Sequence, residues 1–132
     1  MPYAEEVFDT LNKREIKVAL NTGFTKAITD TILNRLNWLT NESIDEVISS
    51  DEVELGRPHP FMIRNLMDRL QISDVKLVVK VGDTEVDVQE GRNSGCGLVV
   101  SVTTGAYTRQ QLESYDPDFV IDNLKELLPL IL

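Results

Sequence analysis

Two acidic residues follow an apolar run in the middle of the chain. The run from Lys76 to Val81 predicts a buried parallel strand, and Gly82 turns the backbone just before Asp83. Asp83 therefore stands at the carboxyl end of a strand, where open α/β sheets bind ligands. Asp87 follows one helical turn later, so both carboxylates can face one crevice and hold a divalent cation such as Mg²⁺.

The same segment has a second interpretation that needs no metal. Thr84 and Asp87 have the spacing of a helix capping box, and acidic side chains near a helix N-terminus are stabilising by themselves. The two interpretations are compatible, because Thr84 can cap the helix while Asp83 faces a cation.

Three further residues complete a possible reaction site. Thr22 and Gly23 follow a short apolar strand, and Arg57 lies in a loop rich in glycine and proline. In a parallel sheet these segments end at one edge, which would bring Thr22, Arg57, Asp83 and Asp87 together. A hydroxyl, backbone amides and a guanidinium suit phosphoryl oxygens, and the acids suit a metal. Taken singly, Thr22 also fits a turn or cap and Arg57 a surface cation.

Composition narrows the classes of partner. The 132 residues carry a formal net charge of −9, which disfavours nucleic acid and anionic membrane surfaces. Cys96 is the only cysteine, so no internal disulfide can form, and its sequence context suits a small buried side chain. The single histidine, His59, lies between two prolines and is interpreted as structural or near substrate rather than catalytic. No apolar run has the length of a membrane span and no signal peptide is recognisable, so a cytoplasmic location is expected.

Helical and strand patterns alternate along the chain. This alternation predicts one α/β domain over 1–132 with a mainly parallel sheet. The expected helices are 4–13, 25–39, 60–70, 85–93, 110–114 and 124–128, the last ended by Pro129, and the expected strands are 16–20, 44–48, 76–81, 98–102 and 119–121. Helix 25–39 is expected to pack on the sheet through Ala27, Ile28, Ile32, Leu33 and Leu36.

Three motifs in order resemble those of a known family. Leu20-Asn-Thr-Gly-Phe24, Gly56-Arg-Pro-His-Pro60 and Val81-Gly-Asp-Thr-Glu-Val-Asp87 look like the second, third and fourth motifs of the haloacid dehalogenase superfamily of hydrolases. Arg57, with Lys80 before the last motif, is most similar to the phosphonatase-like branch, which includes phosphonoacetaldehyde hydrolase. The resemblance implies a three-layer αβα, Rossmann-like core.

The resemblance also implies roles for the site residues. Thr22 and Gly23 would bind the phosphoryl group, Arg57 would stabilise the nucleophile and phosphoryl charge, and Asp83 would bind Mg²⁺. Asp87 would support that metal directly or through water. The substrate would be a small phosphorylated or phosphonate metabolite.

One family motif has no counterpart here. The family's first motif, Asp-x-Asp-x-Thr, carries the nucleophilic aspartate on a strand that precedes a cap domain, and no segment of the 132 residues matches it. That strand lies centrally in the family's sheet, between the strands that precede Thr22 and Asp83. Its absence would make those strands pair directly or leave backbone groups unpaired, which favours association through an exposed edge.

Two functions remain open from the sequence. The first is the C-terminal core of a Mg²⁺-dependent phosphatase or phosphonatase-like hydrolase, inactive alone and binding metal weakly, that acts through an aspartyl-phosphate when complete. The second is a non-catalytic binding or assembly module that takes its missing strand from a partner or from a second copy.

Overall fold

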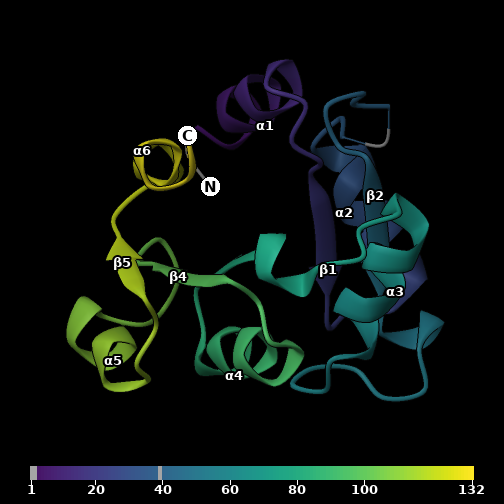
Figure 1. Cartoon of the computed structure of the whole chain (residues 1–132). Helices are drawn as coiled ribbons and strands as arrows, with labels where there is room; N and C mark the ends of the chain where they lie inside the picture. Colours follow the sequence, from purple (N-terminus) through teal and green to yellow (C-terminus); the bar gives the residue numbers. More distant parts are fainter. Residues whose placement is uncertain (1–2, 39) are drawn as a thin grey trace. The chain divides into compact units, whose positions relative to one another are not determined.

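The computed structural model describes residues 3–38 and 40–132. The chain divides into two compact units, one formed by 1–7 with 74–132 and the other by 8–73, and the boundary falls within helix α1 (Ala4–Lys13). Each unit is described here by itself (Figure 1), and one domain over 1–132 stays a prediction. No helix in the described part of the chain is long and apolar enough to cross a membrane.

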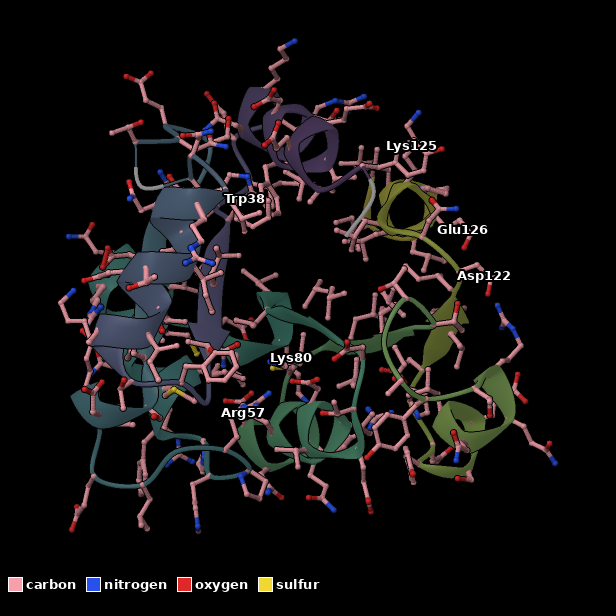
Figure 2. All side chains as sticks on the ribbon, turned by 180° about the vertical axis from the view of Figure 1, so that it is seen from behind. Trp38, Arg57, Lys80, Asp122, Lys125 and Glu126 are labelled. Carbon is pink, nitrogen blue, oxygen red and sulfur yellow. The ribbon has the colours of Figure 1, made fainter. Side chains whose placement is uncertain are left out.

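The unit 8–73 is built on a pair of parallel strands. Strand β1 (Ala19–Thr22) is paired with β2 (Glu46–Ser49), so that Thr22 lies opposite Ser49 at the carboxyl end. Helix α2 (Lys26–Arg35) connects the two strands, and the turn η1 (Ser50–Glu52) and helix α3 (Phe61–Leu70) follow them. Helix α3 lies in front of this sheet in Figure 1, and α2 lies in front of it in the reverse view of Figure 2.

The apolar core of this unit lies between β2 and α3. Ile48, Met62 and Leu66 are buried together, with Ala19 and Val53 packed against them. Pro60 directly precedes α3 at its N-cap position, as the sequence predicts within one residue.

Helix α2 differs from its prediction in length and in orientation. The helix ends at Arg35 rather than continuing to Leu39, a residue that lies outside the described part of the chain. The prediction of packing on the sheet is wrong for Ala27, Ile28, Ile32 and Leu36, which are all exposed. Leu33 is buried as predicted, and Thr29 is buried beside it on the same helix. Burial of Thr29 is tolerated because its hydroxyl donates a 2.8 Å hydrogen bond to the Thr25 carbonyl.

The second unit contains a three-stranded parallel sheet. Its strands are β3 (Val79–Gly82), β4 (Leu98–Val102) and β5 (Phe119–Ile121), in the order β3-β4-β5, with Gly82 opposite Ser101. Helix α4 (Glu85–Ser94) packs on β3 and β4, and helix α5 (Arg109–Ser114) packs on β5. Every strand pairing in the described residues is parallel, which confirms the predicted α/β class.

Two predicted boundaries in this unit are wrong. The segment Val75–Leu77 forms a 3₁₀ turn, η2, capped by the Asp74 side chain, so β3 begins only at Val79 and Leu77 is exposed. At the end of the chain, Pro129 does not stop the helix. It lies in the first turn of α6 (Leu128–Ile131), after the turn η3 (Leu124–Leu127), where a missing N–H has no cost.

Two glycines determine the conformation of the connection between α4 and β4. Gly95 ends α4 with φ of 81°, a left-handed cap that the sequence predicts. Gly97 comes so close to the turn η2 that a Cβ on it would lie 1.9 Å from the Lys76 carbonyl oxygen. The absence of a side chain at Gly97 is therefore a requirement of the packing.

A carboxylate links α4 to the start of β5, and its ionisation should make stability depend on pH. Asp118 accepts hydrogen bonds from Arg92 (3.2 Å) and from the Val99 amide (2.7 Å), and these donors lower the pKa of Asp118. Because the folded pKa is below the unfolded one, this stabilisation is present above the unfolded pKa and is lost as pH falls through the folded pKa. Asp118→Asn should therefore lower the urea midpoint at pH 7, and the difference from wild type should shrink below pH 4. A difference that stayed constant across this pH range would contradict an ionic origin.

Candidate active site

The loop between β3 and α4 is held by a complete capping box. Thr84 is the N-cap residue, and its Oγ1 accepts a hydrogen bond from the Asp87 amide at 3.2 Å. In return, Asp87 Oδ2 accepts from the Thr84 amide at 3.1 Å, from the Thr84 hydroxyl at 2.9 Å and from the Asp83 amide at 3.0 Å. The capping interpretation of the sequence is thus confirmed.

The other oxygen of Asp87 faces a buried cation. Lys80 Nζ lies 3.4 Å from Asp87 Oδ1 and 2.8 Å from Glu90 Oε1. Gly82 approaches the Asp87 carboxyl group so closely that a Cβ on it would lie 2.4 Å from Oδ2. Both oxygens of Asp87 are therefore engaged within the protein, which favours a role in fixing the loop over direct coordination of a metal.

Asp83 presents the open carboxylate of this loop. Its backbone amide is bound to Asp87, while its side-chain oxygens accept no hydrogen bond within the described residues. Gly105 lies directly against this carboxylate, because a Cβ on Gly105 would lie 2.2 Å from Asp83 Oδ2. An oxygen donor with free lone pairs is what a Mg²⁺ ligand requires, so Asp83 fits the metal that the family motif implies.

The unit 8–73 brings together the residues predicted to bind phosphate. Thr22 ends β1, and its hydroxyl oxygen accepts a 3.1 Å hydrogen bond from the Phe24 amide, which leaves the hydroxyl proton available for donation. Arg57 packs over the next residue, because a Cβ on Gly23 would lie 2.9 Å from Arg57 Nη2. The Arg57 guanidinium therefore lies against Gly23, the residue that follows Thr22.

The predicted site is distributed over the two units. Thr22, Gly23 and Arg57 belong to 8–73 and Asp83 and Asp87 to the other unit, so their convergence on one edge stays a prediction. No cluster of three or more His, Cys, Asp or Glu side chains suited to a metal ion occurs within 3–38 and 40–132.

The predicted site does not include Cys96 or His59. Cys96 is buried, and burial raises the pKa of its thiol. His59 is exposed and its ring stacks on Phe61, with the ring centroids 6.1 Å apart.

Sequence reasoning missed three residues of this neighbourhood. Lys80 was noted only as part of a motif, and Glu90 and Gly105 were not singled out. A lysine inside an otherwise apolar strand was the available signal, because a buried lysine requires an acidic partner. Glu90 follows Asp87 by three positions, which places both carboxylates on one side of α4. Gly105 gave no signal of its own.

Comparison with known proteins decides the family. A family model described as "Haloacid dehalogenase-like hydrolase" matches residues 1–101 of the chain. The chain belongs to the haloacid dehalogenase-like hydrolases. Its curated relatives in this family include the phosphonoacetaldehyde hydrolase of Latilactobacillus sakei, which is 33% identical over 99% of this chain and 57% of that protein. That of Bacillus cereus strain G9842 is 31% identical over 85% of this chain and 43% of its own length.

Solved structures of haloacid dehalogenase-like hydrolases share the fold. A phosphonoacetaldehyde hydrolase-like protein from Oleispira antarctica superposes with a TM-score of 0.83 at 25% identity, over 99% of this chain and 55% of that one. A protein described as a phosphoglycolate phosphatase from Lactobacillus delbrueckii gives a TM-score of 0.89 at 20% identity, over 100% of this chain and 53% of that one. These matches confirm the predicted Rossmann-like fold. The chain spans about half the length of the curated relatives that it matches.

Proposed function

We propose that this chain supplies the phosphate-binding and metal-binding part of a Mg²⁺-dependent hydrolase that acts on a small phosphonate or phosphorylated metabolite in the cytoplasm. The observation that carries the proposal is the open carboxylate of Asp83, held at the end of β3 by a capped loop. The Gly-Arg-Pro sequence at 56–58 and the 33% identity to a phosphonoacetaldehyde hydrolase favour a phosphonate substrate.

The residues of the chain divide the chemistry between them. Asp83 would hold Mg²⁺, which would neutralise charge on the transferring group. The Thr22 hydroxyl donates to a phosphoryl oxygen, and Arg57 offsets negative charge on the phosphoryl group and its attacking aspartate. Gly23 lets the guanidinium lie against the backbone next to Thr22. The attacking aspartate, which would carry the phosphoryl group as an aspartyl-phosphate, belongs to the family's first motif.

Complementation tests this proposal. The chain alone should show no Mg²⁺-dependent hydrolysis of phosphonoacetaldehyde or of p-nitrophenyl phosphate. A fusion in which the N-terminal half of the Latilactobacillus sakei relative precedes the chain should hydrolyse one of them, and Asp83→Asn should abolish that activity. The exposed change Asp30→Asn, on α2, is the control and should leave it unchanged.

Two outcomes would contradict the proposal. A folded fusion inactive on both substrates would exclude the hydrolase role. Turnover by the chain alone, lost in Asp83→Asn, would show that the nucleophile lies within these 132 residues.

One observation supports the second candidate, an assembly module. Among the described strands, β1 is paired with β2 and with no other strand, and β3 is paired only with β4, so each sheet ends in a strand that has a strand neighbour on one side only. Sedimentation velocity over a range of concentrations tests this candidate. Self-association that a soluble peptide carrying the relative's first-motif strand suppresses would support it, and a monomer at all concentrations that does not bind the peptide would exclude it.

A further inference from the structure

We infer that Lys80 is a positioning residue, which acts through Asp87 to hold the backbone of Asp83 and Thr84 in place. The relevance of this inference to catalysis rests on the proposed function. Its structural content concerns only the order of the loop between β3 and α4. Figure 2 shows Lys80 beside α4 in the interior of its unit.

Lys80 belongs to a buried cluster of three charges. The exposed fraction is 7% for Lys80, 6% for Asp87 and zero for Glu90. A buried charge is costly unless it is paired, and here one ammonium lies between two carboxylates. Apolar side chains would fill the same volume without that cost. Since a buried ion pair is weak evidence for stability, the cluster calls for a role other than holding the fold together.

Asp87 connects this cluster to the candidate site. Lys80 Nζ contacts Asp87 Oδ1, while Asp87 Oδ2 accepts hydrogen bonds from the amides of Asp83 and Thr84 and from the Thr84 hydroxyl. A carboxylate held at one oxygen by an ammonium cannot rotate without breaking the contacts of the other oxygen. Lys80 therefore fixes the direction in which Asp87 offers its acceptor to the loop.

The packing around Lys80 leaves its side chain little freedom to move. A Cβ on Gly91 would lie 3.1 Å from both Cβ and Cγ of Lys80, so α4 approaches the lysine stem at a residue without a side chain. With its stem confined between β3 and α4, the ammonium group meets Glu90 on one side and Asp87 on the other. In this arrangement Glu90 balances the charge of Lys80, and Lys80 orients Asp87.

The test separates positioning from stability with a double variant. Lys80→Met/Glu90→Met removes one charge of each sign, so the net charge is unchanged and a buried ion pair is replaced by apolar side chains of similar length. Replacement of a buried ion pair by apolar side chains often preserves stability. In this variant Asp87 also loses its cation and keeps the hydrogen bonds from Asp83 and Thr84. Hydrogen exchange is then measured by NMR on the whole metal-free chain, and the measured quantity is the exchange rate of the Asp83 and Thr84 backbone amides. The matched control is Lys125→Met/Glu6→Met, which removes an exposed ion pair of the same composition, 3.3 Å in length, from the same unit.

We expect the Asp83 and Thr84 amides to exchange about tenfold faster in the double variant, while amides of β4 keep their protection. The control should change neither set. Unchanged exchange at Asp83 and Thr84 in a folded double variant would overturn the inference. So would a loss of protection spread equally over β4, which would show a purely structural role.

A second variant keeps the inference testable if the double variant does not fold. Glu90→Gln leaves Lys80 with Asp87 as its carboxylate partner, so the two loop amides should keep their protection within about twofold. A tenfold loss would show that Glu90, not Lys80, holds the loop. A separate Mg²⁺ titration of the Asp83 resonance in wild type tests the proposed function, and its failure would leave the exchange result intact.

Discussion

Lys80→Met alone should lower the free energy of unfolding by about 3–5 kcal/mol, because removing one partner of a buried ion pair leaves an uncompensated charge. Here two carboxylates, those of Asp87 and Glu90, would stay buried without their cation. Urea unfolding followed by circular dichroism measures this loss. The single variant should therefore be much less stable than the Lys80→Met/Glu90→Met double variant, although it carries fewer substitutions.

Lys76→Met is the control for this prediction. Lys76 lies four residues earlier and is exposed, so the same change of residue type should alter stability by less than about 0.5 kcal/mol. Equal effects at the two positions would mean that burial of the Lys80 ammonium does not set the cost. A single variant as stable as the double variant would mean that Asp87 and Glu90 tolerate burial without Lys80.

Gly97→Ala should be the most destabilising replacement of a glycine by alanine in the unit formed by 1–7 and 74–132, with a loss of about 3 kcal/mol or more. The added Cβ would meet a backbone oxygen, that of Lys76, at 1.9 Å, and a backbone atom cannot rotate away as a side chain can. Relief requires separation of the turn η2 from the start of β4, which also strains the 3.0 Å hydrogen bond from the Gly97 amide to the Val78 carbonyl. Thermal unfolding should show the loss as a lower midpoint.

Gly56→Ala is the matched change at an open position. The nearest atom to a Cβ on Gly56 is Ser50 Cβ at 3.5 Å, an ordinary contact, so the midpoint should move little. If Gly97→Ala were as mild as Gly56→Ala, the close approach of Lys76 to Gly97 would not exist in solution.

Much of the fold could be predicted because helix caps and strand patterns depend on residues that are close in the sequence. The Thr84–Asp87 capping box, the left-handed cap at Gly95 and strand β4 each depend on residues a few positions apart, and each was predicted correctly. The errors arose where contacts with segments distant in the sequence determine which face of an element is buried. Helix α2 has an apolar stripe at helical spacing, yet it turns Thr29 and Leu33 inward.

In the candidate site, too, local sequence rules predicted some features, and contacts between distant segments determined the others. Asp83 and Asp87 could be selected from their position after a strand, but their different roles depend on Lys80, a residue on the strand before them. Gly105 is visible only in three dimensions, since it contacts Asp83 from a loop after β4. Spacing in the sequence thus selected Asp83 and Asp87, and tertiary contacts determined which of the two carboxylates is left open.

The length of one side chain in the capping box carries a further consequence. At the third position of such a helix start, glutamate or glutamine is the usual residue, whereas this chain has the shorter Asp87. Gly82 lies directly against that carboxyl group, so we expect a side chain longer by one methylene to press on the strand. Helix α4 by itself would accept glutamate there, but the strand beside it would not. A helix that starts with the less usual of two acceptable residues can therefore indicate, in other chains too, a position where a neighbouring strand has set the length of the side chain.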